Sequence, residues 1–257
     1  MNARTLPLLL AASLTATAKE PVVSATPEAP EMQTDRPDST ESPFTGVRGM
    51  WQVESELLSC ERDAGHTSVL WGATNLKYGL SDTMDIQLVT PGWLEQKNGP
   101  DGWTDMEIRL KCNLTGPGKD PAISWGLIPF IKLPVASHLI GNGNWEGGLI
   151  LPMATSLSEH VDLAWMVEGD LVRNEADNGW TGAATVSASL GFEVTKRLSA
   201  FTELAATFTA GSDTELYGNT GLIWTFNSNW TMDAGVNIGL TGPSTDLRVF
   251  TGTSFRF

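Results

Sequence analysis

The chain has 257 residues, with 16 Lys and Arg against 30 Asp and Glu, so its formal net charge is -14. This acidity argues against nucleic-acid binding and against docking on an anionic membrane through a basic patch. The two cysteines, Cys60 and Cys112, are too few for a disulfide scaffold or a zinc site. They also fall on predicted strands that are not neighbours, so we expect no bridge between them and predict no metal or cofactor.

The first residues have the layout of a secretory signal. Arg4 precedes an apolar run that ends at Leu14, and small residues precede Lys19, so we predict a signal peptide over residues 1–18. Residues 19–45 are rich in Pro, Ser, Thr and Glu and show no hydrophobic period, which predicts a flexible segment unless the rest of the protein holds it. No later stretch reaches the roughly 18 apolar residues of a transmembrane helix.

From residue 46 to residue 257 apolar and polar residues alternate, as they do along β-strands. In the stretch 105–114, Glu107 and Arg109 belong to a polar set on one face, and the apolar set lies on the other. Such runs last for about ten residues, which is the length of a tilted membrane-spanning strand. We therefore predict an all-β chain with a transmembrane antiparallel β-barrel over residues 46–257.

Applied to the whole chain, the same pattern predicts about twelve strands. They lie near 50–60, 67–78, 84–91, 104–114, 121–132, 145–157, 161–170, 181–193, 198–209, 215–226, 230–240 and 247–257. Tight turns are expected at 79–83, 116–120, 158–160, 195–197 and 227–229, and longer loops at 91–103, 134–144 and 171–179. Short turns on one side and long loops on the other are typical of an outer-membrane barrel with both termini in the periplasm.

Tryptophan placement supports the membrane barrel. Trp93, Trp103, Trp145 and Trp180 fall where a predicted strand meets a long loop, which indicates an aromatic girdle at a membrane–water interface. The alternative is a soluble β-sandwich, in which tryptophans lie in the core and strands also alternate. Strongly charged polar faces on strand after strand favour the barrel.

If the apolar residues face lipid, the charged residues must line the lumen, since each would cost about 2–4 kcal/mol in hydrocarbon. The predicted lumen residues are Glu54, Glu56, Asp85, Asp105, Glu107, Arg109, Lys111, Asp162, Glu168, Glu193, Glu203, Asp233, Arg248 and Arg256. One interpretation is an acidic pore that favours cations or neutral polar solutes over anions. The other is that these side chains pair across a narrow lumen and fill it.

Residues 19–45 provide a third element, because this segment could fold back into the lumen as a plug. Its charged residues Asp35, Arg36, Asp38 and Glu41 would then find partners on the wall, and Arg109, Lys111, Arg248 and Arg256 are the candidate cations. Glycines at predicted lumen positions, such as Gly235, Gly239 and Gly252, leave room for a solute or relieve curvature, and curvature is the preferred explanation.

Catalysis is not indicated. His66 and His138 fall in predicted long loops and His160 falls in a tight turn on the opposite side, and no nucleophile or metal motif accompanies them. We therefore predict a channel or transporter for small molecules, not an enzyme. A structural or surface-interaction barrel that uses the loop 91–103 is the alternative.

Two motifs carry a resemblance to known proteins. The end of the chain, Gly-Thr-Ser-Phe-Arg-Phe at 252–257, resembles the C-terminal signal read by the barrel-assembly machinery, although Phe250 departs from it. The run TDRPDSTESP at 34–43 and the stretch 76–93, which closes with Pro-Gly-Trp, resemble the transporter family named for the meta-pathway of phenol degradation. The resemblance implies an outer-membrane barrel that transports aromatic or other small organic compounds, with outer-membrane lipid, the assembly machinery and the solute as partners.

Overall fold

The computed structural model describes residues 32–116, 122–174 and 179–257. The predicted signal peptide lies outside these residues, as do most of the predicted turn 116–120 and part of the predicted loop 171–179. The described residues form fifteen strands and no helix, and they therefore contain no helix that is long and apolar enough to cross a membrane. The strands are β1 Trp51–Asp63, β2 His66–Trp71, β3 Thr74–Ser81, β4 Met84–Thr90, β5 Trp93–Gln96, β6 Gly102–Trp103, β7 Met106–Asn113, β8 Ser124–Leu133, β9 Glu146–Ser158, β10 Val161–Asn174, β11 Gly179–Thr195, β12 Leu198–Thr209, β13 Glu215–Asn227, β14 Trp230–Gly239 and β15 Leu247–Arg256.

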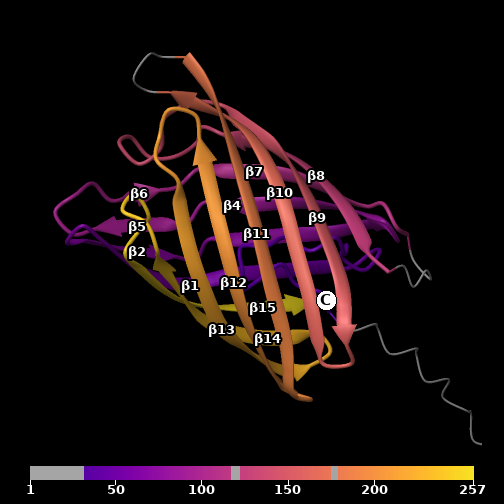
Figure 1. Cartoon of the computed structure of the whole chain (residues 1–257). Coiled ribbons are helices and arrows are strands. Elements are labelled where there is room, and N and C mark those ends of the chain that lie inside the picture. The colour runs from indigo at the N-terminus through magenta and orange to yellow at the C-terminus, as the bar shows by residue number, and fades with distance from the viewer. Residues whose placement is uncertain (1–31, 117–121, 175–178) are drawn as a thin grey trace, which may run out of the picture.

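Twelve of these strands close into one antiparallel barrel (Figure 1). Starting from β15, each strand pairs with the preceding one in the order β14, β13, β12, β11, β10, β9, β8, β7, β4, β3 and β1. The ring closes because β1 also pairs with β15, with Gln52 opposite Arg256 at one end and Arg62 opposite Leu247 at the other. The predicted all-β barrel of about twelve strands is therefore confirmed.

The remaining strands β2, β5 and β6 continue barrel strands beyond a local interruption. β2 precedes β3, β5 follows β4, and β6 precedes β7, so three long strands are each broken in two. Gly72 interrupts the first with a φ of 70°, a value that glycine adopts at little cost. Pro91 interrupts the second, because proline has no N–H to donate to the ladder. The pieces β2, β5 and β6 pair with one another and extend one end of the barrel.

The connections differ in length at the two ends. At one end, which we call the short-turn end, two-residue connections join β3 to β4, β9 to β10, β11 to β12 and β13 to β14. At the other end, the long-loop end, loops such as 134–145 and 240–246 are longer. The predicted loop 171–179 is shorter than expected, because β10 continues to Asn174 and β11 begins at Gly179, with Arg173 lying over the Trp180 ring.

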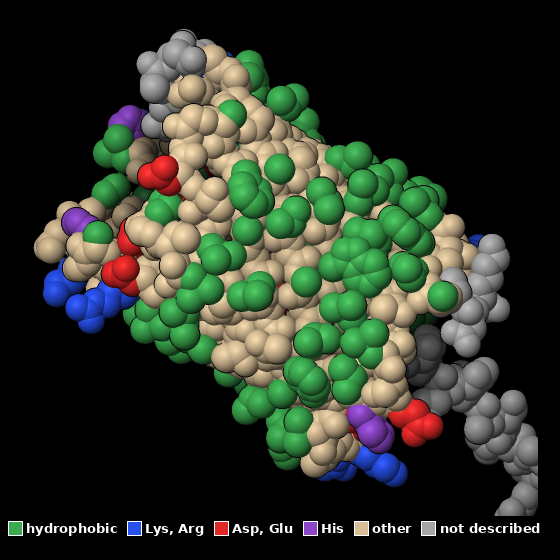
Figure 2. Space-filling view, in the orientation of Figure 1, with side chains coloured by type: hydrophobic (Ala, Val, Ile, Leu, Met, Phe, Trp, Pro, Cys, Tyr) green, Lys and Arg blue, Asp and Glu red, His purple; other side chains and the backbone are tan. Residues whose placement is uncertain are grey.

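The barrel is polar inside and apolar outside. In β1 the side chains of Gln52, Glu54 and Glu56 are buried, whereas Trp51 and Leu57 are exposed. Figure 2 shows hydrophobic side chains spread over the wall, with charged side chains gathered at its two ends. This arrangement is the reverse of a soluble β-sandwich and is that of a barrel surrounded by lipid.

Aromatic residues ring both ends of the apolar wall. Trp103, Trp145 and Trp180 are exposed near the long loops, as predicted, and Trp93 packs edge-on against Trp103. A second girdle lies at the short-turn end, which the sequence interpretation missed: Trp51, Trp224, Phe226, Trp230, Phe255 and Phe257. Two girdles are expected of a membrane barrel, because indole and phenyl rings stabilise both interfaces.

The two cysteines do not pair. Cys60 lies on β1 and Cys112 lies on β7, and both are free thiols. A bulge between Glu56 and Leu58 shifts the alternation of β1 and leaves Cys60 exposed on the outer face, while Ser59 is buried inside.

Candidate functional site

Residues 32–49, which we call the N-terminal segment, lie inside the barrel. The segment enters at the short-turn end, where Met32 and Gln33 share a cavity with residues of the β11–β12 and β13–β14 turns. It returns to that end before β1, where Gly49 N–H donates to the Gly79 carbonyl at 2.8 Å. The TDRPDSTESP motif therefore forms an inward loop whose two limbs run through the same opening.

A hydrogen-bonded closure holds the inward loop in shape. The backbone N–H and the hydroxyl of Ser42 both donate to Asp35 Oδ1, at 3.0 and 2.8 Å. Thr34 Oγ1 donates to the Arg36 carbonyl at 2.8 Å. Short Asp, Ser and Thr side chains suit this role, because they hydrogen-bond nearby backbone groups in place of a regular ladder.

One wall of the lumen carries a basic row of three cations, Lys77 on β3 with Arg109 and Lys111 on β7. Strand β4 lies between them, and its Gln87 is opposite Lys77 on one side and opposite Arg109 on the other. The side chains of Lys77 and Lys111 are only 3% and 0% exposed.

The segment places two carboxylates on the basic row. Lys111 Nζ lies 2.6 and 2.5 Å from the two Asp35 oxygens, and Lys77 also pairs with Asp35. Glu41 divides its oxygens between Arg109 at 2.6 Å and Lys111 at 3.3 Å. Buried cations with such partners are stabilised, since each charge is paired and hydrogen-bonded.

The positively charged Arg36 of the segment contacts two acidic side chains of the wall, which we call the acidic pair. The Arg36 guanidinium pairs with Asp233 on β14 at 2.8 Å and with Glu56 on β1 at 3.4 Å. Gly252 on β15 makes room for it, because a Cβ there would overlap the guanidinium. Close approach of Arg36, not curvature alone, therefore explains this glycine.

The tip of the inward loop is held by a third wall group, Glu203 on β12. Ser39 N–H donates to Glu203 Oε2 at 3.1 Å, and Thr40 Oγ1 donates to Glu203 Oε1 at 2.5 Å. Thr40 also lies 2.7 Å from the hydroxyl of Ser187 on β11. Together with the basic row and the acidic pair, these bonds fasten the segment to strands all around the ring.

Two carboxyls of the segment have displaced pKa values of opposite sign. Burial opposes ionisation of Asp35, but Lys111 and Lys77 outweigh it and hold the pKa well below its ordinary value. Burial and the neighbouring Glu203 raise the pKa of Asp38 to about 8, despite a hydrogen bond with Ser189. Asp35 is therefore ionised in the docked segment, whereas Asp38 retains its proton at neutral pH.

The structure brings together many of the predicted lumen residues and separates others. Glu54, Glu56, Asp85, Arg109, Lys111, Glu203 and Asp233 contact the segment directly. Glu107 pairs with Arg109, and Arg248 pairs with Glu56 and Glu61. Glu168, on β10, lies near Arg109 and Glu41.

The others lie toward the barrel ends. Asp105 binds Lys132 at the long-loop end, 3.1 Å away. Asp162 accepts a hydrogen bond from Ser156. Glu193 is partly exposed and lies 3.2 Å from His160. Arg256 donates a hydrogen bond to Asn229 in a short turn.

The sequence interpretation missed Lys77 and Gln52. Both are 3% exposed, and Gln52 Nε2 donates to the Gln33 carbonyl at 2.7 Å. Lys77 alternates with Leu76 and Tyr78, so its lumen position was readable from the strand period.

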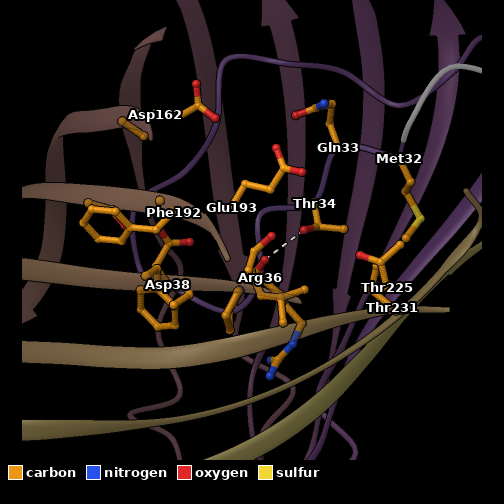
Figure 3. A pocket seen from close by; sticks show the side chains of 18 of the residues that line it. Met32, Gln33, Thr34, Arg36, Asp38, Asp162, Phe192, Glu193, Thr225 and Thr231 are labelled. Carbon is orange, nitrogen blue, oxygen red and sulfur yellow. Dashed lines mark hydrogen bonds between the residues drawn. The ribbon is translucent and has the colours of Figure 1, made fainter. Parts of the chain in front are cut away.

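Cavities flank the segment. A cavity of about 580 Å³ opens between it and strands β10 to β14 at the short-turn end, and Figure 3 shows Thr34, Arg36 and Asp38 of the segment around it with Asp162 and Glu193 of the wall. A smaller cavity of about 270 Å³ is lined by Ser39, Glu61, Tyr217 and Arg248, among others. Among the described residues, no group of three His, Cys, Asp or Glu side chains is placed to hold a metal ion.

The family model described as "Putative MetA-pathway of phenol degradation" matches residues 34–257, so the match begins at the first residue of the TDRPDSTESP motif. The chain belongs to this family. No curated protein matches it in sequence.

Three solved structures share the fold. An outer membrane channel from Pseudomonas putida F1 has a TM-score of 0.62 at 12% identity, over 83% of this chain and 98% of that one. The NanC porin has a TM-score of 0.57 at 6% identity, over 80% and 98%. The KdgM porin has a TM-score of 0.50 at 12% identity, over 80% and 99%.

Proposed function

We propose that this protein is an outer-membrane channel for small molecules. The observation that carries the proposal is a closed barrel whose interior is charged, and whose lumen holds a segment fastened to the wall by ion pairs and hydrogen bonds. Polar contacts to a loop can be exchanged for contacts to water and solute, whereas a packed apolar core cannot. The proteins with the same fold named above are a channel and porins.

The proposed cargo is small organic compounds, including aromatic ones. This class is suggested by the family description, which refers to phenol degradation. The cavities beside the segment, about 580 and 270 Å³, are of a size that admits single small molecules. No catalytic role is proposed for any residue.

The proposed orientation places the short-turn end, with both chain termini, in the periplasm. Phe257 and Trp51 exchange backbone hydrogen bonds of 2.9 Å at that end, so the first and last barrel strands meet there. The terminal strand, with its outward Phe255, is the proposed contact for the barrel-assembly machinery, and residues 1–18 are the proposed export signal.

Within this proposal the N-terminal segment is the plug, and passage requires it to move. The loop leaves through the short-turn end without breaking any strand, because its contacts are to side chains of the wall and to the Gly79 carbonyl. The barrel ladder itself therefore need not open.

A disulfide lock tests this function. Thr40 and Ser187 have hydroxyls 2.7 Å apart, so T40C with S187C in the full chain, with C60S and C112S to remove the native thiols, should bond the plug to β11. In planar bilayers we expect discrete current steps under reducing conditions and their loss on oxidation. The parent with only C60S and C112S should conduct equally in both. A barrel that is silent in both redox states would count against a channel.

A further inference from the structure

The basic row binds two carboxylates side by side, and both come from the N-terminal segment. Asp35 offers both oxygens to Lys111 and is also paired with Lys77, while Glu41 bridges Arg109 and Lys111. The row is thus already shaped for carboxylate groups, with charge, burial and donor geometry in place.

Lys111, in the middle of these contacts, depends on the two segment carboxylates for both of its ion pairs. When the segment is removed, Lys77 keeps Glu54 and Arg109 keeps Glu107, but within the described residues both ion pairs of Lys111 are with the segment. The nearest wall acid in register is Asp85, which loses the hydrogen bond from Gly46 when the segment withdraws and keeps the one from Gln87. Withdrawal therefore removes two carboxylates from Lys111 and leaves Asp85 as the one wall acid opposite it, so an open lumen favours another anion at this place.

We propose that the basic row is a binding site for solute carboxylates, which the Asp35 and Glu41 side chains occupy at rest and which an organic acid takes as the segment withdraws. This inference rests on the proposed channel function. It differs from the sequence expectation of cations or neutral solutes, because Lys77, Arg109 and Lys111 are gathered on one part of the wall, where the two segment carboxylates add to the wall acids Glu54 and Glu107.

The acidic groups of the lumen make this row selective. Glu203, Asp233 and Glu56 are the partners of Ser39, Thr40 and Arg36, so they lie along the other side of the segment. An anion that enters is repelled by these acids and held on the basic row. Its apolar part can reach the buried cluster of Ile128, Ile150 and Met166 on β8, β9 and β10. This cluster is next to the row, because Met166 accepts the Glu41 N–H. Small aromatic or aliphatic acids fit this combination.

Competition with the plug provides the test. In the T40C/S187C protein with C60S and C112S, the rate of disulfide formation reports how often the segment is docked, whether or not the barrel conducts. Sodium benzoate, compared with sodium chloride at the same concentration, should slow the reaction by roughly fivefold, which corresponds to about 1 kcal/mol. Benzamide, which has the same ring but no charge, should leave the rate unchanged.

Substitution of the row separates a specific site from general salt effects. K111Q should abolish the difference between benzoate and benzamide, because it removes the cation shared by both carboxylates. K132Q is the matched control, since Lys132 pairs with Asp105 and Glu146 and does not touch the segment; it should retain the full difference.

The outcomes are distinct for the two proposals. Equal rates with benzoate and benzamide, in a protein that conducts when reduced, would overturn the carboxylate site and leave the channel standing. A benzoate effect lost in K111Q, in a barrel that never conducts, would support the site and remove the channel. Equal loss of the effect in K132Q would also overturn the site.

Discussion

Lys111 on β7 and Asp35 in the N-terminal segment form a two-oxygen ion pair across 76 residues of sequence, with Nζ 2.6 and 2.5 Å from the carboxylate oxygens. The pair joins the TDRPDSTESP motif to the wall at a lysine that is 0% exposed. It links the inward loop to a single register of the barrel, because a slip of β7 by one residue would turn Lys111 toward lipid.

The Asp35–Lys111 pair should show strong coupling in a double-mutant cycle. D35N leaves Lys111 with Glu41 alone and K111Q leaves Asp35 with Lys77 alone, so each variant removes one of the two ion pairs of a buried charge and should lower the free energy of unfolding by about 1–3 kcal/mol. The double variant should lose less than the sum, with a coupling energy on the order of 1–3 kcal/mol. Urea unfolding of the refolded barrel measures this. Additive losses would show that the pair contributes nothing as a pair.

Gly252 should be intolerant of larger residues because of Arg36. The Cβ of G252A would overlap the guanidinium, which must leave Asp233, and we expect a destabilisation of roughly 1–3 kcal/mol together with more frequent channel opening. G191A is the control, since nothing lies within 4 Å of a Cβ at that lumen position. Equal effects in the two variants would contradict the role of Gly252.

Docking of the segment should weaken as the pH rises from about 4 to about 8. The pKa of Asp38 is about 8 when docked and near its ordinary 3.8 when the segment is free, so docking takes up a proton and becomes less favourable across this window. Glu41 acts in the same direction, because burial and Asp35 raise its pKa. Asp35, whose pKa is lowered, loses its contribution only below its ordinary pKa.

Open probability in planar bilayers measures this pH dependence. The wild-type protein should open more often at pH 8 than at pH 5, and D38N should flatten the profile by removing the proton uptake. D213N, at an exposed loop residue, should follow the wild type. A D38N profile as steep as that of the wild type would exclude Asp38 as the titrating group.

The second aromatic girdle should stabilise the short-turn end. Trp230 stacks on Phe226 with ring centroids 4.2 Å apart, and its Nε1 donates to Thr253 Oγ1 at 3.0 Å. W230A should lower the free energy of unfolding in lipid by about 1–3 kcal/mol, and W230F, which keeps the ring but not the N–H, should lose less. If W230F lost as much as W230A, the hydrogen bond and not the stack would be the main contribution.

Much of the architecture was readable from local sequence. Alternation placed Glu54, Glu203 and Asp233 on inward faces, because the strand period is two whatever the neighbours are. Short turns and tryptophans marked the barrel ends for the same reason, since turn chemistry and interface preference act over a few residues. The inward position of Lys77 was also predictable from the strand period.

The remaining features of the fold and the contacts of the N-terminal segment were determined by closure of the barrel. The bulge after Glu56, the interruption at Gly72 and the extended β10 and β11 depend on how paired strands fit, which a single strand does not reveal. The contacts of Arg36 with Asp233 and of Thr40 with Glu203 join residues 197 and 163 positions apart. The sequence determined which side chains face inward, because this follows from the local strand period. Only the closed barrel determined which inward charges form ion pairs, because the distances between them are set once all strands are in register.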